Sequence, residues 1–121
     1  MRIKQKKDLG NFGEQIAVSF LETKGYKILH RNFYYKQGEI DIIAKDENNS
    51  EIVFVEVKTR TNNIFGNPSE AVNGIKINHI CKSAKYFLFK FHLTDAFVRF
   101  DIIEVLLKNG KFYINHIKQI I

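Results

Sequence analysis

Cysteine and proline are nearly absent from this 121-residue sequence, which contains one of each. The single Cys81 excludes an internal disulfide, and no Cys/His cluster with zinc-ligand spacing is present. One proline and seven glycines, against eleven phenylalanines and five tyrosines, exclude a disordered or low-complexity chain. Because no apolar run is long enough to span a membrane and the basic N-terminus leads into no signal core, we expect a cytoplasmic protein.

Apolar and basic residues are both abundant. Apolar residues make up 45% of the chain, enough for the core of a single domain spanning residues 1–121, in which residues 1–8 are expected to be a flexible basic segment. The formal net charge of +6 suits a polyanionic partner such as nucleic acid, although charge alone is weak support for one.

Hydrophobic periodicity predicts the element order α-β-β-β-α-β-β, a mixed β-sheet with a helix at each side. Residues 11–24 have helical spacing, with Asn11 and Glu14 as a capping box. A second helix is expected to begin at Asn67-Pro68-Ser69-Glu70, with Gly74 as a potential break. Its apolar stripe then comprises Ile77, Ile80, Cys81, Ala84, Phe87 and Leu88.

Runs of β-prone residues bounded by turn signals predict five strands, at residues 26–33, 38–44, 52–60, 97–107 and 111–120. The last two strands are joined by Asn109-Gly110, the strongest short hairpin signal in the chain. The strand at 52–60 begins apolar on both faces, which is typical of a central strand covered on two sides. The final strand is expected to be an exposed edge, which offers an interface for a homodimer.

Two carboxylates are expected to face one another across a hairpin. If Asp46 pairs with Glu51 across the polar turn, register counting places Asp41 opposite Glu56, with Cβ atoms roughly 5 Å apart. Lys58 follows Glu56 on the same face of its strand. Because like charges directly opposite one another are destabilising, such a pair requires a cation, a proton or basic neighbours.

A divalent cation supplies that compensation, and Mg²⁺ favours carboxylates together with waters and phosphate oxygens. We therefore expect Mg²⁺ or Mn²⁺ at Asp41 and Glu56, polarising a phosphodiester, with Lys58 positioning water or neutralising charge. Glu14, on the inner side of its helix, is expected to complete the surroundings of the metal directly or through water. The candidates for holding substrate phosphates are Arg60, Thr61 and Lys76.

Each of these residues also has an ordinary structural interpretation. Glu-x-Lys on a strand is common as a solvated ion pair, Asp41 alone fits a strand end, and Glu14 fits the capping box. Glu39 shares the face of Asp41 and is either a further ligand or an ion-pair partner of Arg31, Arg60 or a lysine. The combination favours a metal site, because buried carboxylates without a metal or basic partner are unstable.

Several short motifs occur along the chain: Gly13-Glu14, Gly25-Tyr26, Arg31-Asn32, Gly38-Glu39-Ile40-Asp41, Phe54-Val55-Glu56-Val57-Lys58-Thr59-Arg60 and Phe65-Gly66. Together these motifs resemble the YraN-like family of uncharacterised bacterial proteins. That family is similar to the PD-(D/E)xK nuclease superfamily and, within it, to archaeal Holliday junction resolvases. The resemblance implies a single-domain restriction-endonuclease-like α/β fold, with a mixed β-sheet flanked by helices.

The resemblance also implies roles for individual residues. Asp41, Glu56 and Lys58 match the catalytic motif, Glu14 matches the helical glutamate, and the backbone carbonyl of Val57 is implied as a metal ligand. Two positions depart from the pattern. Ile40 stands where the superfamily motif has its leading proline. Tyr34 stands where an arginine is expected, two residues after Asn32.

These observations lead to one principal hypothesis and two rivals. The principal hypothesis is a Mg²⁺- or Mn²⁺-dependent endonuclease for which DNA is favoured over RNA as the substrate, with branched or junction DNA suggested by analogy alone. The first rival is a non-catalytic nucleic-acid-binding module that retains the fold. The second rival is a subunit-interaction protein, because the chain is small and rich in phenylalanine.

Overall fold

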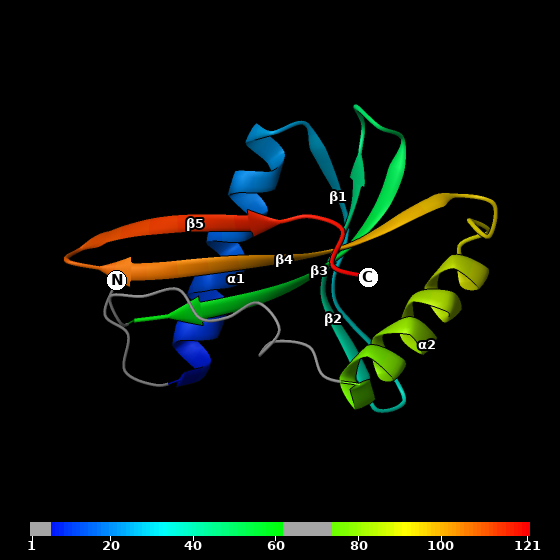
Figure 1. The fold of residues 1–121 in the computed structure, drawn as a ribbon, viewed down its shortest axis with the longest axis horizontal. Coiled ribbons are helices and arrows are strands. Elements are labelled where there is room, and N and C mark those ends of the chain that lie inside the picture. Colours follow the sequence, from blue (N-terminus) through cyan, green and yellow to red (C-terminus); the bar gives the residue numbers. More distant parts are fainter. Residues whose placement is uncertain (1–5, 62–73) are drawn as a thin grey trace.

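The computed structural model describes residues 6–61 and 74–121. Over these ranges the chain forms two helices and a five-stranded mixed sheet in the predicted order, which confirms the α/β fold class (Figure 1). The elements are α1 (Lys6–Thr23), β1 (Tyr26–Tyr35), β2 (Gly38–Asp46), β3 (Glu51–Arg60), α2 (Gly74–Lys90), β4 (Phe97–Lys108) and β5 (Lys111–Ile117). Neither of these helices is long and apolar enough to cross a membrane.

The sheet has the strand order β1-β2-β3-β4-β5, so β5 lies at an edge as predicted. β1, β2 and β3 pair antiparallel in sequence, and β5 pairs antiparallel with β4. β3 and β4 run parallel. A parallel pair requires a crossover connection, and α2 lies within the segment that joins these two strands.

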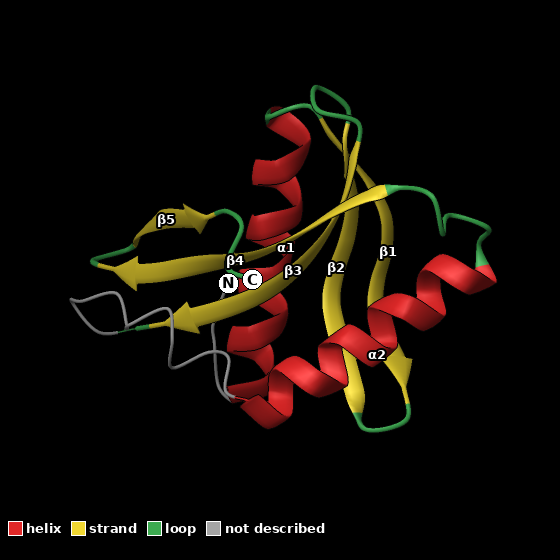
Figure 2. Cartoon of the chain, turned by 45° about the vertical axis from the view of Figure 1, so that its right-hand side comes forward, coloured by secondary structure: helices red, strands yellow, loops and turns green. Residues whose placement is uncertain are grey.

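The two helices cover opposite faces of the sheet, with α1 behind it and α2 in front of it in Figure 2. On one face, Leu21 of α1 belongs to the same buried cluster as Val53 and Val55 of β3. On the other face, Phe87 of α2 belongs to a cluster with Phe54 of β3. The predicted two-sided burial of β3 is therefore confirmed. It makes β3 a rigid support for the charged residues that follow.

The first helix begins earlier than predicted. α1 starts at Lys6, so Asn11 lies in its interior and the predicted capping box of Asn11 and Glu14 is wrong. A local cap signal is overruled when the preceding residues can themselves be helical, and residues 6–10 contain neither proline nor a β-branched side chain. Of the segment 1–8, which is expected to be flexible, residues 6–8 belong to α1 and residues 1–5 lie outside the described residues.

The second helix confirms part of the predicted apolar stripe. Ile80, Ala84 and Phe87 are buried, whereas Cys81, expected in the core, is only half-buried. Ser83 is buried although the pattern did not predict it, because its hydroxyl donates to the backbone carbonyl of His79 at 2.9 Å. The predicted N-cap at residues 67–70 and the Phe65-Gly66 motif lie outside the described residues.

Candidate active site

The backbone of β2 is irregular at Asp41. The predicted pairing of Asp46 with Glu51 is confirmed, and the ladder between β2 and β3 runs from that pair to Ile42 opposite Val55. Within the described residues, Asp41 has no ladder partner in either neighbouring strand. Ile40 packs in the cluster under α2 and Ile42 in the cluster under α1, although residues two apart in a regular strand share a face. The side chains of β2 therefore change faces of the sheet at Asp41.

The side chain of Asp41 reaches β3 instead. Its Oδ2 accepts a hydrogen bond of 2.8 Å from the backbone N–H of Val57. The N–H and the carbonyl of one strand residue point toward the same neighbouring strand. The Val57 carbonyl, which the family resemblance implies as a metal ligand, therefore faces the Asp41 side of β3.

Asp41 and Glu56 line one cavity of about 400 Å³, between the start of β2, the middle of β3 and the first turns of α2. Glu56 Oε1 forms an ion pair with the ammonium of Lys76, which lines the same cavity. The structure therefore brings together three of the predicted site residues. Lys76, predicted to hold a substrate phosphate, neutralises one of the two carboxylates in this structure.

Asn32 of β1 connects two further carboxylates to this region. With its amide nitrogen facing the two acids, that nitrogen lies 3.0 Å from Glu14 Oε1 and 3.3 Å from Glu39 Oε1. Asn32 has a φ of 53°, a left-handed conformation that asparagine tolerates better than most residues. Asn32 lies in the part of β1 that faces Asp41, because the flanking residue pairs are Phe33 with Ile40 and Arg31 with Ile42.

Four acidic side chains of this region interact electrostatically and form one acidic site: Asp41, Glu56, Glu14 and Glu39. Burial and, after it, the nearby Glu56, Glu14 and Glu39 together raise the pKa of Asp41 to about 8, against the lowering effect of the Val57 N–H. Burial also raises the pKa of Glu14, with Arg31 opposing that rise and Glu39 and Glu56 adding to it. A site whose carboxylates repel one another in this way favours a bound proton or cation.

The donor set suits Mg²⁺ or Mn²⁺ better than a metal that needs a full set of protein ligands. Over residues 6–61 and 74–121, no three His, Cys, Asp or Glu side chains lie close enough to hold a metal by themselves. Mg²⁺ is commonly bound by one or two carboxylates and completes its octahedron with waters and phosphate oxygens. Asp41, Glu56 and the Val57 carbonyl supply such a partial set.

β3 continues beyond the cavity with three more predicted site residues. Lys58 is half-buried and lies opposite Glu104 in the parallel ladder. Arg60 Nε lies 3.3 Å from Glu104 Oε2, so Arg60 forms an ion pair with a buried carboxylate. Thr61 is exposed just after the strand. None of the three is among the described residues that line the cavity.

Comparison with known proteins identifies the family. The model of the Uncharacterised protein family UPF0102 matches residues 13–105. The chain belongs to this family. A UPF0102 protein of Clostridium botulinum strain 657 is 51% identical over 115 residues, which cover 93% of this chain and 92% of that protein. A UPF0102 protein of Caldicellulosiruptor saccharolyticus is 50% identical over 115 residues, covering 93% and 96%.

The resemblance to the YraN-like family is thereby confirmed as membership of UPF0102. Among solved structures, the chain is similar to the crystal structure of SSO0001, with a TM-score of 0.33 and 15% identity. The match covers 93% of this chain and 51% of that one.

Two glycines of this UPF0102 chain bring the elements of the site together. A Cβ on Gly13 would lie 2.9 Å from Thr59 Cβ, so only glycine lets α1 approach β3 this closely next to Glu14. A Cβ on Gly38 would lie 2.7 Å from the carbonyl oxygen of His79, so only glycine lets the start of β2 approach α2. Both glycines occur in the motifs that carried the resemblance, and the structure gives each of them a packing role.

A second group of charged residues in the UPF0102 chain was not predicted. Arg99 of β4 is buried and forms ion pairs with Asp101 at 2.9 Å and with Asp46 and Glu51 at 3.0 Å. His116 Nε2 lies 2.7 Å from Asp101 Oδ2. The signal that identifies them is the alternation of Arg99 and Asp101 within the apolar run of β4, which resembles the alternation of Glu56 and Lys58 in β3.

Proposed function

We propose that this UPF0102 protein is a Mg²⁺- or Mn²⁺-dependent endonuclease that hydrolyses phosphodiester bonds in DNA. The observation that carries the proposal is that Asp41 and Glu56 line one cavity, where burial and neighbouring carboxylates raise the pKa of Asp41 to about 8. A carboxylate pair of this kind is stabilised by a divalent cation. The net charge of +6 adds a general attraction for the DNA backbone.

The residues divide the chemistry among them. Asp41, Glu56 and the Val57 carbonyl would hold the ion, which would supply Lewis-acid polarisation of a phosphodiester. Lys58, two residues beyond Glu56 on the same strand, positions the attacking water or neutralises developing charge. Glu14 acts from α1 through water and through its contact with Asn32.

Three basic or hydroxyl side chains are assigned to substrate phosphates. Lys76 lines the cavity beside Glu56, where its ammonium would contact a phosphate oxygen of a bound substrate. Arg60, the last residue of β3, and Thr61, just after it, would hold phosphates outside the cavity. DNA is favoured over RNA as the substrate. A homodimer paired through the β5 edge would contain two such sites, which suits two symmetrical cuts.

A substrate panel tests the activity. Duplex, single-stranded, flap and four-way-junction DNA are incubated with Mg²⁺, with Mn²⁺ and with EDTA, and RNA of the same sequences serves as the polymer control. We expect metal-dependent cleavage that Asp41→Ala abolishes. Cleavage that survives Asp41→Ala would remove the site assignment.

A specific observation favours a second candidate, a non-catalytic nucleic-acid-binding module. Glu56 is already neutralised by Lys76, an arrangement that requires no metal. Calorimetric titration with Mn²⁺ discriminates between the two candidates. The endonuclease binds Mn²⁺ with an affinity that Asp41→Ala removes, whereas the module binds DNA in a salt-sensitive manner and gives no metal signal.

A further inference from the structure

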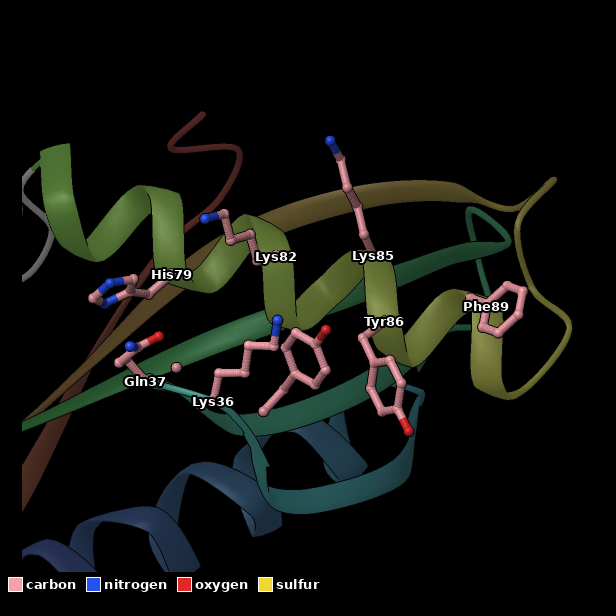
Figure 3. A pocket seen from close by; sticks show the side chains of 9 residues that line it. Lys36, Gln37, His79, Lys82, Lys85, Tyr86 and Phe89 are labelled. Carbon is pink, nitrogen blue, oxygen red and sulfur yellow. The ribbon is translucent and has the colours of Figure 1, made fainter.

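A basic groove lies beside the acidic site, between the β1–β2 turn and α2. It has a volume of about 410 Å³. It is lined by Lys36, Lys82 and Lys85 and by the aromatic residues Tyr35, Tyr86 and Phe89. In Figure 3 the residues of α2 project from successive turns of the helix, and Lys36 rises from the turn beneath it. None of the described residues that line the groove is acidic.

The groove contains a stacked pair of aromatic rings and one exposed ring. The rings of Tyr35 and Tyr86 stack with centroids 4.3 Å apart and an interplanar angle of 17°. The ammonium of Lys36 lies 5.4 Å from the centroid of the Tyr35 ring. Phe89, one end of the groove, is 70% exposed, so it adds little to the core of the free protein. Exposed apolar patches rimmed by polar residues are typical of binding surfaces.

We propose that the basic groove binds a single-stranded segment of DNA that leads into the acidic site. This inference rests on the proposed endonuclease function and names the form of its substrate. Lysines neutralise the phosphates of a strand, and aromatic rings stack on its bases. Bases of a duplex are already stacked and paired, so only an unpaired segment uses both kinds of side chain.

The groove is continuous with the acidic site. Gln37, Gly38 and His79 line both cavities. Along α2, His79, Lys82, Tyr86 and Phe89 recur at helical spacing and so share one face of the helix. From Lys76 in the acidic site to Phe89 the helix rises about 20 Å at 1.5 Å per residue, a path of several nucleotides.

This geometry defines the substrate class. A strand held by the groove reaches Asp41 and Glu56 several nucleotides from the Phe89 end, so the substrate needs an unpaired stretch of several nucleotides beside the cut. Flaps, overhangs and opened junctions contain such a stretch, whereas a continuous duplex does not. We therefore expect cleavage of flap DNA in preference to a duplex of the same sequence.

Binding is tested in EDTA, where no cleavage takes place, by the fluorescence anisotropy of labelled oligo(dT). Phe89→Ala should weaken binding at least about fivefold, because it removes a stacking ring. Lys82→Gln with Lys85→Gln should reduce the slope of log affinity against log salt by about 1.4, for two phosphate contacts on a single strand. Lys108→Gln with Lys111→Gln makes the same charge change on the β4–β5 hairpin and should weaken binding much less than the groove pair does.

The control decides the outcome. If the hairpin pair weakens oligo(dT) binding as much as the groove pair does, or if Phe89→Ala has no effect, the groove proposal is wrong. Circular dichroism of each variant checks the fold. Phe89, Lys82 and Lys85 are exposed, so the changes leave the core intact.

Cleavage distinguishes failure of the groove from failure of the proposed function. Asp41→Asn should bind oligo(dT) normally and cut nothing, whereas Phe89→Ala should cut flap DNA in Mn²⁺ with a raised KM. Cleavage that is lost in Asp41→Asn but unaffected by the groove changes overturns the groove and keeps the endonuclease. Groove-dependent binding without any metal-dependent cleavage overturns the endonuclease and keeps the groove as a single-strand-binding site.

Discussion

Asp41 and Val57 are joined by a hydrogen bond of 2.8 Å in which a side-chain carboxylate receives a backbone N–H at the point where the β2–β3 ladder ends. The bond fixes the Asp41 carboxylate against a rigid central strand. It also leaves the second carboxylate oxygen for another partner, since Oδ2 alone accepts it. The site is therefore oriented by the sheet before any ligand arrives, as a preorganised site requires.

The raised pKa of Asp41 predicts a dependence of folding on pH in the absence of metal. Between about pH 4 and pH 8 the folded protein holds a proton on Asp41 that the unfolded chain has released. The stability from this group is complete below about pH 4 and is lost as the pH rises through about 8, by up to about 1.4 kcal/mol per unit. Asp41→Asn should remove this loss and be more stable than the wild type at pH 9 in EDTA.

Urea unfolding at pH 5, 7 and 9 measures this effect. Asparagine keeps an oxygen for the Val57 N–H, so the variant differs mainly in charge. Glu47→Gln, a change of the same type in the exposed turn after β2, is the control. Equal pH profiles for the wild type and Asp41→Asn would contradict the assigned pKa.

Metal binding should depend on the protonation of Asp41. Since a cation competes with the proton of Asp41, the affinity for Mn²⁺ should rise by up to about tenfold per pH unit below pH 8 and level off above it. Calorimetry in buffers of different ionisation enthalpy detects the released proton. An affinity that does not change from pH 6 to pH 8 would show that Asp41 is not a ligand.

Lys76 should act as a competitor of the metal for Glu56. Lys76→Gln removes the ammonium from Glu56 and should tighten Mn²⁺ binding in the absence of DNA by up to about fivefold, the range of a partly exposed ion pair. DNA binding in EDTA should weaken at the same time. Lys76→Arg retains the charge and is the matched control. If Lys76→Gln weakens Mn²⁺ binding, Lys76 supports the metal site instead of competing for it.

Gly13 and Gly38 should be intolerant of alanine for steric reasons. The added Cβ would collide with Thr59 or with the His79 carbonyl, and overpacking of this kind costs about 1–3 kcal/mol. Gly10→Ala is the control in the same helix as Gly13, because no atom lies within 4 Å of its added Cβ. That variant should be slightly stabilised. Thermal unfolding measures all three, and equal melting temperatures for Gly10→Ala and Gly13→Ala would contradict the packing role.

The sequence predicted the fold class and the Asp46–Glu51 register because both depend on local periodicity and on one turn. It did not predict that the side chains of β2 change faces of the sheet at Asp41. This irregularity depends on packing against two different helices, which local periodicity does not reveal. The start of α1 was also missed, since a cap motif is only a weak local preference. The pairing of Arg60 with Glu104 joins strands far apart in sequence, which no spacing within β3 reveals.

Asp101 should be the most costly carboxylate to neutralise. It is 1% exposed, and its carboxylate accepts hydrogen bonds from Arg99 and from the Gln119 N–H and lies 2.7 Å from His116 Nε2. Burial alone would raise the pKa of Asp101, but these hydrogen bonds hold it below its usual value. Asp101→Asn leaves the buried Arg99 short of its main partner and should cost about 3 kcal/mol or more in urea unfolding at pH 7.

Glu51→Gln provides the comparison, because Glu51 also pairs with Arg99 but its side chain is 23% exposed. Its loss should cost under about 1 kcal/mol. The sign of the pH dependence separates the two further. The stability that the lowered pKa of Asp101 provides is present above about pH 4 and is lost as the pH falls through the folded value. The difference between the wild type and Asp101→Asn should therefore shrink in acid, and a constant difference from pH 7 to pH 3 would show that Asp101 acts through packing and not through its charge.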